Sequence, residues 1–435
     1  MLLNRRPLDS TAINAGALDG TQVRIVAVSA FLSKVSAEFT CGFECGIVVQ
    51  GAATAPEGRH WHLASGTTTL ETSTVRSGAR AGRFATAGTT TYLGRNVTGT
   101  PNVAVARFAI RFVGSLPSSS VNLFAFTTGG SFCFLHYIQS SQKLGVSFVG
   151  NASGATLGPV VAADTWYVID FRADASANPW KIDWRVDGAV QTQKTSALAA
   201  NTFTTFRIGA NVDTGAGTPT YDLLVDDIIV STGSTLDYPF GDGKVVGIRP
   251  SYDGTHSFTL GTFKYDNSTN VATSATDVYT YLDDNPINGL TEYISQNVLA
   301  AGEYVEFGFP TPADTGTARA VEVVAAHHAS STTAHAVSMK LNDGGTLADV
   351  YAGADLSNTT ITYWSKQFGA PPTGGLWTQA KLAALKVRWG YASNVGSVPF
   401  LDGVMLEVEY APGQLPTRLH GIMGGGFVGL LGGFQ

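Results

Sequence analysis

The chain is 435 residues long; 14% of its residues are charged, 50 are glycine, and the formal net charge is −6. This length allows two or three domains, each with its own core. The negative charge provides no basic surface that could neutralise phosphates, which argues against nucleic-acid partners. Many glycines and few charged residues are typical of short strands joined by turns, so we expect an all-β fold.

The N-terminal sequence MLLNRRPLDST lacks the apolar core of a signal peptide, and no later segment approaches about 18 uninterrupted apolar residues. We therefore expect neither a secretory leader nor a membrane span. The three cysteines do not make a disulfide framework, and their odd number leaves at least one thiol unpaired. These features fit folding in a reducing cytosol, with release from the cell by a route such as lysis.

Residues 1–37 are predicted to form an N-terminal arm. An apolar residue followed by Asn or Asp recurs every five residues, and the apolar members are Leu3, Leu8, Ile13 and Leu18. Because Asn and Asp favour turns, we expect a compact ladder of apolar side chains. So short a ladder cannot bury itself, which predicts an assembly contact with this chain or with a partner. The alternative is a frayed tail that repeats by chance.

Residues 38–235 are predicted to form a first β-sandwich. Short alternating segments follow one another between turns, among them VAVARFAIRFVG, SFCFLHYI, TWYVIDFRA and TFRIGANV. In IDWRVDG, Ile182, Trp184 and Val186 alternate with charged residues before an Asp-Gly turn. This alternation predicts one strand face in the core and the other in water.

The segment YDLLVDDIIV places Asp226 and Asp227 side by side in an apolar strand. Successive side chains of an extended strand point to opposite faces, so the two carboxylates could serve one site only if a β-bulge intervened. We therefore interpret them as structural. One acid is expected to face solvent, while the other bonds a neighbouring turn or helps hold an ion at the sheet edge.

The turn-rich segment STGSTLDYPFGDGK, residues 231–244, is predicted to separate two domains. Residues 236–412 then repeat the strand-and-turn pattern in segments such as EYVEFGFP, ARAVEVVAAHHAS and VMLEVEYAP, which predicts a second β-sandwich. Only LWTQAKLAALK has helical spacing, and its predicted apolar face consists of Leu376, Ala380, Ala383 and Ala384.

Residues 413–435 are predicted to form an apolar, glycine-rich tail. The tail is too short and too rich in glycine to cross a bilayer, and its large apolar side chains would favour aggregation in water. We expect them to be buried in an assembly contact made by Ile422, Phe427, Leu430, Leu431 and Phe434. The alternative is a tail folded back on its own domain.

Histidines are the first candidates for a metal site. His60 and His62 lie on one side of the extended segment RHWH, but no nearby Cys or third His completes a ligand set, which favours a surface or packing role. His327 and His328 are adjacent on a strand and should point apart. With His335, at most two of them could meet across a hairpin.

The cysteines and acids form no recognised catalytic motif. Cys41 and Cys45 could share a strand face, but zinc ribbons use tighter pairs in duplicate, so buried free thiols are predicted. No G-x-S-x-G, Walker or H-E-x-x-H motif occurs. A glycosidase would need two acids facing across a cleft, and the candidates are Asp283, Asp284, Glu292, Glu303 and Glu306. Most of these acids are expected on solvated strand faces, although EYVEFGF would also suit sugar stacking.

Several longer phrases resemble known families. HWHLASGTTTLETSTVRSGARAGRF resembles the opening of a concanavalin-like (laminin-G-like) jelly-roll domain, and WKIDWRVDGAV with YDLLVDDIIV resembles its closing strands. The second half resembles minor tail or tail-fibre-type proteins of tailed bacteriophages, on the phrases YPFGDGKVVGIRPSYDGTHSF, YLDDNPINGLTEYISQ, LKVRWGYASNV and FLDGVMLEVEY. The resemblance covers most of residues 38–411 and depends on the joint order of strand and turn phrases.

The resemblance implies a structural protein of the phage virion, made in the host cytoplasm and located at the tail in preference to the capsid. We predict other virion proteins as partners, a homo-oligomer with a trimer favoured, and contact with host-surface glycans. We also predict no enzymatic activity and no cofactor. Calcium is the alternative, because the turns DDNPIN and NDGG offer oxygen ligands, although turn formation explains them too. The alternative functions are a capsid or head decoration protein and a virion-associated glycan depolymerase.

Overall fold

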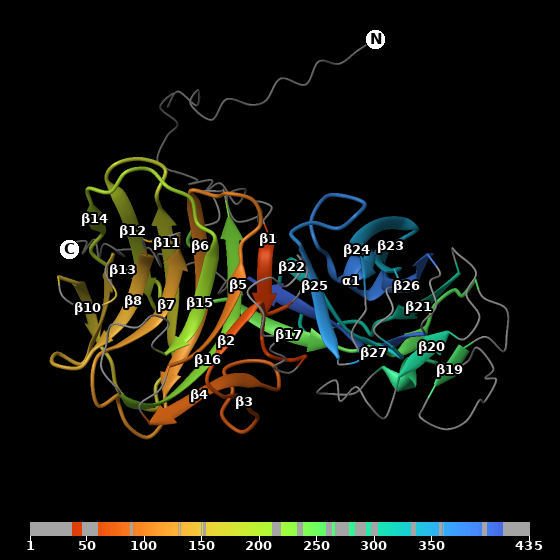
Figure 1. Cartoon of the computed structure of the whole chain (residues 1–435), viewed down its shortest axis with the longest axis horizontal. Helices are drawn as coiled ribbons and strands as arrows, with labels where there is room; N and C mark the ends of the chain where they lie inside the picture. The colour runs from red at the N-terminus through yellow and green to blue at the C-terminus, as the bar shows by residue number, and fades with distance from the viewer. Residues whose placement is uncertain are drawn as a thin grey trace, which may run out of the picture. The chain divides into compact units, whose positions relative to one another are not determined.

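The computed structural model describes residues 37–45, 60–87, 90–128, 130, 132–148, 150, 154–210, 219–232, 238–257, 263–265, 278–282, 293–296, 303–331, 336–355, 359, 361–393 and 398–411. Within these ranges the fold is all-β, as predicted, with antiparallel strands in four sheets and one short α-helix. The sheets form two β-sandwiches, one from each half of the chain (Figure 1).

The first layer of the first sandwich is a nine-stranded sheet. Its strands are β1 (Ala37–Cys41), β3 (Thr68–Glu71), β4 (Ala81–Ala87), β6 (Val103–Phe112), β11 (Tyr167–Asp174), β12 (Trp180–Val186), β13 (Ala189–Val190), β14 (Lys194–Ser196) and β16 (Thr220–Thr232). The order across the sheet is β13-β12-β11-β6-β16-β4-β3, with β1 also paired to β16 and β14 to β12. The long strands β6 and β16 are therefore central.

The second layer of the first sandwich is a seven-stranded sheet. Its strands are β2 (Leu63–Ser65), β5 (Thr91–Asn96), β7 (Val121–Thr127), β8 (Phe132–Ile138), β9 (Lys143–Ser147), β10 (Thr156–Val160) and β15 (Thr205–Ala210). The order across the sheet is β10-β9-β8-β7-β15-β5-β2. Some adjacent strands of this sheet, such as β7 and β15, are far apart in sequence, so residues from separate segments lie together on one face of the sheet.

The second sandwich also has two layers. The six-stranded sheet contains β17 (Lys244–Ile248), β19 (Phe263–Tyr265), β20 (Ile294–Gln296), β22 (Ala318–Ala329), β25 (Thr362–Phe368) and β27 (Pro399–Tyr410). The five-stranded sheet contains β18 (Tyr252–Asp253), β21 (Tyr304–Gly308), β23 (Ala336–Asp343), β24 (Thr346–Asp355) and β26 (Leu385–Ser393). A 3₁₀ helix covers Val278–Tyr281.

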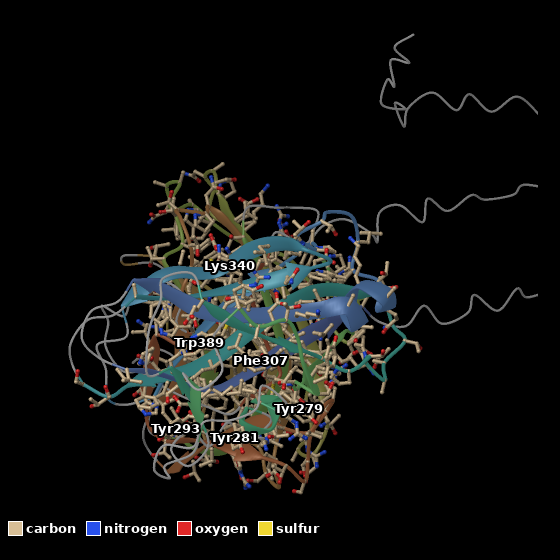
Figure 2. The ribbon with its side chains drawn as sticks, turned by 90° about the vertical axis from the view of Figure 1, so that its right-hand side faces the viewer. Tyr279, Tyr281, Tyr293, Phe307, Lys340 and Trp389 are labelled. Atoms are coloured by element: carbon tan, nitrogen blue, oxygen red, sulfur yellow. The ribbon has the colours of Figure 1, made fainter. Side chains whose placement is uncertain are left out.

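Each sandwich encloses an apolar core built by strand alternation. In β12 the residues Ile182, Trp184 and Val186 are buried in the first core, as their spacing predicts. In the second sandwich Phe307 and Trp389 lie fully buried between the sheets (Figure 2). Burial of these large side chains is the main favourable contribution to folding.

The one described α-helix differs from the prediction. Helix α1 spans Gln379–Ala384 and buries Leu382. Ala380 and Ala384 are exposed, as is Leu376, which precedes the helix. The predicted apolar face is therefore wrong, because a helix of fewer than two turns does not extend far enough to form it. Among helices of the described ranges, none has the length and apolar character that a bilayer crossing requires.

The polar outer faces of the two sandwiches meet. Strand β1 packs against β22, β25 and β27 of the second sandwich. Arg107 of β6 and the acids Glu322, Glu407 and Glu409 of β22 and β27 point away from their own cores, yet all four are 0% exposed. Alternation had predicted wet outer faces for such strands. Here that prediction is wrong, because each sandwich covers the polar face of the other.

Candidate functional site

The outer face of the seven-stranded sheet carries the side chains best suited to bind a ligand. On β8, alternate residues from 133 to 137 enter the core, so Phe132, Phe134 and His136 lie on the opposite face. The same alternation places Tyr92 of β5 and Arg207 of β15 on that face, because their neighbours Leu93, Phe206 and Ile208 are core residues.

Aromatic and cationic groups lie together on this face. The rings of Phe132 and Phe134 stack with centroids 5.0 Å apart and an interplanar angle of 20°. The guanidinium Cζ of Arg207 lies 5.2 Å from the centroid of the Tyr92 ring. Phe134 is fully buried beside Ala125, whereas Tyr92, Phe132 and Arg207 are partly exposed. These three partly exposed side chains can therefore be reached by a ligand.

A buried polar triad lies on the same face. His136 Nδ1 is 2.6 Å from Asn122 Oδ1, and His136 Nε2 is 2.6 Å from Ser147 Oγ. Because an amide oxygen only accepts, Nδ1 donates to it, and Nε2 accepts from the serine hydroxyl. Burial lowers the pKa of His136 to about 3, which keeps the imidazole neutral at ordinary pH. The triad therefore fixes polar groups on the sheet without placing a charge there.

This face has the chemistry of a carbohydrate-binding surface. Planar rings offer stacking area to the apolar faces of a sugar ring, and Arg207 offers hydrogen-bond donors to its hydroxyls. These residues were not among the candidates predicted from the sequence. The sequence feature that could have indicated them is the alternation in SFCFLHYI. This alternation distinguishes the two faces of the strand but does not show whether the outer face contacts solvent, a ligand or another part of the protein.

Asp226 and Asp227 reach the same loop, contrary to the expectation for a regular strand. The pairing of β16 with β6 shifts between Asp226 and Ile229, and Asp227 has a φ of 54°. These two features define a β-bulge, which turns the second carboxylate toward the side of the first. Both acids are 0% exposed, so the prediction that one faces solvent is wrong.

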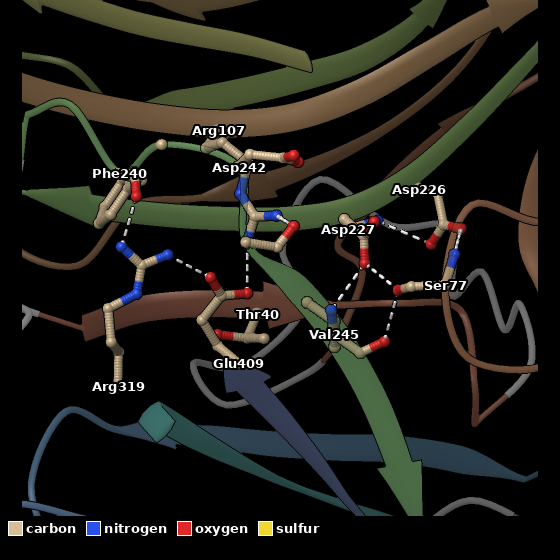
Figure 3. A network of polar contacts seen from close by, with 12 residues as sticks. Thr40, Ser77, Arg107, Asp226, Asp227, Phe240, Asp242, Val245, Arg319 and Glu409 are labelled. Atoms are coloured by element: carbon tan, nitrogen blue, oxygen red, sulfur yellow. Dashed lines mark hydrogen bonds and ion pairs between the residues drawn. The ribbon is translucent and has the colours of Figure 1, made fainter. Parts of the chain in front are cut away.

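The paired carboxylates anchor the loop at Arg76 and Ser77, and the contacts of Ser77 can be followed in Figure 3. Asp226 Oδ2 accepts hydrogen bonds from the backbone N–H groups of Arg76 at 2.9 Å and Ser77 at 3.2 Å. Asp227 forms an ion pair with Arg76, and its Oδ1 accepts from Val245 N at 2.6 Å and from Ser77 Oγ. Burial, then the charge of Asp227, raises the pKa of Asp226 well above its usual range. Both carboxylates therefore bond neighbouring loop residues, where the sequence had predicted this for one of them.

A second buried network links the two sandwiches. Arg107 of β6 pairs with Glu409 of β27, and Arg319 of β22 binds the other oxygen of the same carboxylate (Figure 3). Arg319 also donates to the carbonyl oxygen of Phe240 at 2.6 Å. Burial raises the pKa of Glu409, and the two guanidinium groups oppose that shift. This network holds strands from opposite halves of the chain together.

The acid-rich strand EYVEFGF forms neither the expected solvated face nor the alternative sugar-stacking face. Glu306 is 1% exposed, and its Oε1 accepts from Arg388 Nε at 2.9 Å and from Asn342 Nδ2 at 2.7 Å. The guanidinium of Arg388 also covers the Tyr304 ring, with Cζ 3.6 Å from the centroid. Phe307 lies in the core (Figure 2). The expectation of a solvated strand face was therefore wrong for Glu306, and the alternative of a sugar-stacking face is not supported for this strand.

The adjacent histidines of β22 point apart, as predicted. His327 is buried and its Nε2 bonds the Tyr351 hydroxyl. His328 lies on the other face, with Nδ1 2.7 Å from Asp402 Oδ1 and its ring stacked on Phe400 at a centroid distance of 4.3 Å. These two histidines therefore do not share one metal site.

The described turn NDGG uses its oxygens for hydrogen bonds within the protein. Asn342 Oδ1 accepts from Gly345 N at 2.8 Å, and Asp343 Oδ2 accepts from Thr373 N at 3.1 Å. Turn formation thus accounts for these residues, and the other proposed calcium turn, DDNPIN, lies outside the described residues.

One buried cluster contains the donor atoms that transition metals prefer. Cys41, His60 and Glu407 each offer a ligand atom, and these atoms lie within 4.8 Å of one another. His60 Nε2 is 3.4 Å from Cys41 Sγ and 3.8 Å from Cys45 Sγ. The sequence did not indicate that cysteines lie beside His60; the fold brings His60 to the end of β1, next to Cys41 and Cys45. His62 stays apart and bonds β5 through Nδ1.

Several residues singled out from the sequence lie outside the described residues, and their roles stay predictions. For the assembly contacts these are Leu3, Leu8, Ile13, Leu18, Ile422, Phe427, Leu430, Leu431 and Phe434. For the histidine and carboxylate sites they are His335, Asp283, Asp284 and Glu292.

No protein-family model and no curated protein matches the chain. Among solved structures, the cellulose-induced protein Cip1 matches at 15% identity and a TM-score of 0.34, over 45% of this chain and 98% of its own. The carbohydrate-binding module CBM66 from Bacillus subtilis matches at 8% identity and a TM-score of 0.27, over 40% and 98%. The catalytic domain of a glycoside hydrolase family 131 protein from Coprinopsis cinerea matches at 15% identity and a TM-score of 0.32, over 45% and 94%.

These neighbours include both a carbohydrate-binding module and the catalytic domain of a glycoside hydrolase. Their low identities and TM-scores assign no activity to this chain. They do overturn the prediction that the chain is not an enzyme, since a glycoside hydrolase domain is among the structures that match it. The lack of a recognised catalytic motif was no ground for excluding activity.

Proposed function

We propose that this chain is a glycan-binding structural protein of a tailed-phage virion, located at the tail. The outer face of the seven-stranded sheet is the binding surface in this proposal, and other virion proteins and two further copies of the chain are its partners. The tail location is supported by the resemblance of the second half to minor tail and tail-fibre-type proteins.

The observation that carries the glycan proposal is the set of partly exposed planar groups on one rigid sheet. Tyr92, Phe132 and Arg207 come from three strands, and the pairing of β5, β15, β7 and β8 fixes their spacing. A surface held by a sheet loses little conformational entropy when a ligand binds. That rigidity suits a repeating polymer such as a cell-wall glycan.

The binding surface can be tested with host cell-wall polysaccharide in a sedimentation assay with full-length protein. Tyr92→Ala and Phe132→Ala should each weaken binding roughly tenfold, because each removes one stacking contact. Tyr252→Ala is the matched control, since Tyr252 is an exposed aromatic residue of the second sandwich, and it should bind as the unaltered protein does. Equal affinity of all three variants would refute the assignment of this face.

The same incubation tests glycan cleavage when reducing ends and unsaturated ends are measured. Products formed by the unaltered protein and not by a mock preparation would make the chain a depolymerase.

Immunogold labelling of intact particles tests the location: label at the tail supports the proposal, and label over the capsid supports a decoration protein. Analytical ultracentrifugation tests the trimer.

A further inference from the structure

The cluster at the end of β1 draws its members from three separate parts of the sequence. Cys41 and Cys45 flank a tight turn in which Phe43 has a φ of 60°, His60 begins the next described segment, and Glu407 lies on β27 of the second sandwich. Each of these four potential ligands is at most 1% exposed. The cluster therefore lies wholly inside the protein, between the two sandwiches.

The separations of the imidazole nitrogen from the two sulfurs match those of a tetrahedral metal site. Zinc bonds of about 2.3 Å to sulfur and about 2.0–2.1 Å to nitrogen, at tetrahedral angles, place the two donors about 3.5 Å apart. The observed distances from His60 Nε2 are 3.4 Å to Cys41 Sγ and 3.8 Å to Cys45 Sγ. One imidazole nitrogen thus faces two sulfurs at the separation that a shared ion would require.

The outer contacts of these side chains orient them as metal ligands. His60 Nδ1 is 3.2 Å from Ser365 Oγ and 3.6 Å from Glu322 Oε1, so Nδ1 carries the proton and Nε2 directs its lone pair at the sulfurs. Phe43 N donates to Cys41 Sγ at 3.3 Å, which stabilises negative charge on that sulfur. A carboxylate behind the histidine and an amide on the sulfur are both common around structural metals.

Glu407 supplies the second, independent observation. Its Oε1 accepts from Glu44 N at 3.0 Å, but its Oε2 is buried and has no hydrogen-bond partner among the described residues. A buried carboxylate oxygen without a partner is costly unless a cation binds it. A divalent cation bound beside Glu407 would satisfy that oxygen.

We propose that Cys41, Cys45, His60 and Glu407 bind one divalent transition-metal ion of the zinc class. Four protein ligands with no exposed position make a closed site, which is the arrangement of structural rather than catalytic zinc. Three of the ligands belong to the segment that opens the first sandwich and the fourth to the second, so the ion cross-links them. This inference is independent of glycan binding and could hold if that proposal failed.

Metal analysis of the full-length protein, purified without chelator or affinity metal, is the direct test. Elemental analysis by mass spectrometry should find about one zinc ion per chain. Cys41→Ala and His60→Ala should lose the ion. Cys133→Ala is the matched control, because Cys133 is an equally buried free thiol on β8, in the other sheet of the first sandwich, and does not belong to the group of close donor atoms; it should keep the ion.

A cobalt titration keeps the test valid if the ligand variants fail to fold. Unaltered protein stripped of metal and titrated with Co²⁺ should develop the near-ultraviolet thiolate charge-transfer band and the visible bands of a tetrahedral site. Glu322→Gln, which retains all four ligands, should weaken Co²⁺ binding roughly tenfold by altering the group behind His60. If purified protein contains no transition metal and the stripped protein develops no thiolate band, the proposal is wrong.

Discussion

At Asp227 one backbone torsion reverses the direction of a side chain. A positive φ is uncommon outside glycine, and Asp and Asn tolerate it better than other residues. In a regular strand this carboxylate would lie opposite Asp226, but the bulge brings both to the loop at Arg76 and Ser77. The run of two acids in an apolar strand therefore marks a structural anchor.

Asp227→Asn should destabilise the protein by about 2 kcal/mol. Asn tolerates the same φ and can still accept from Val245 N, so the change isolates the loss of charge opposite Arg76 at a buried position. Asp222→Asn is the control, because that partly exposed partner of Arg83 should cost less than about 1 kcal/mol. Urea unfolding measures both changes, and equal costs would contradict a buried anchor.

His136 should make stability depend on pH below neutrality. Burial lowers its pKa from 6.5 to about 3, so between these values the unfolded chain binds a proton that the folded chain does not. The free energy of unfolding should therefore fall as the pH falls from 6.5 toward 3, by at most about 1.4 kcal/mol per pH unit. Unfolding curves of the unaltered protein and of His136→Gln at a series of pH values test this. A slope that persists unchanged in the variant would exclude His136 as its source.

At the scale of the element, alternation identified strands and their core faces but not what covers the other face. Ile182, Trp184 and Val186 were correctly assigned to the core. Glu407 and Glu409 alternate with core residues in the same way, yet both are buried against the first sandwich. The alternation of polar and apolar residues is the same whether the polar face of a strand contacts water or the polar face of another sheet.

The candidate sites were hard to predict for a related reason. His60 and the cysteines were considered separately, because a site made by residues far apart in sequence appears only once the strands are paired. The aromatic face of the seven-stranded sheet likewise combines β5, β8 and β15, and no local motif marks it. The predicted apolar face of the helix was wrong for a more local reason, because the segment with helical spacing is longer than the helix that forms.

The contact of β10 with β12 gives a prediction about an element. Gly158 lies in β10, and a Cβ atom there would come within 2.2 Å of Trp184 Cη2, a fully buried ring of the first core. Gly158→Ala should therefore destabilise the first sandwich by about 1–3 kcal/mol through overpacking. Gly130→Ala is the control, because nothing lies within 4 Å of its added Cβ, and it should change stability by less than about 0.5 kcal/mol. Thermal unfolding compares them, and a neutral Gly158→Ala would show that β10 moves freely.

At the scale of the whole molecule, the contact between the two sandwiches buries several charged side chains. Arg107, Glu409 and Arg319 form a chain of ion pairs, and Thr40 N donates to Glu322 Oε2 at 2.5 Å nearby. Burying charges is costly unless each is paired, so such a contact favours one relative placement and penalises others. Two sandwiches joined this way should unfold together even though each has its own core.

Glu409→Gln tests this coupling. The change leaves Arg107 fully buried and Arg319 mostly buried without their shared carboxylate. It should therefore lower the free energy of unfolding by about 3–5 kcal/mol. The single calorimetric transition expected for the unaltered protein should also separate into two. The double variant Arg107→Met/Glu409→Met should recover part of the loss, because it removes the fully buried charge of Arg107 and keeps apolar bulk at the contact, although Arg319 still lacks its carboxylate. Two transitions in the unaltered protein, or a Glu409→Gln variant as stable as its parent, would show that the sandwiches unfold independently and that the buried ion pairs do not couple them.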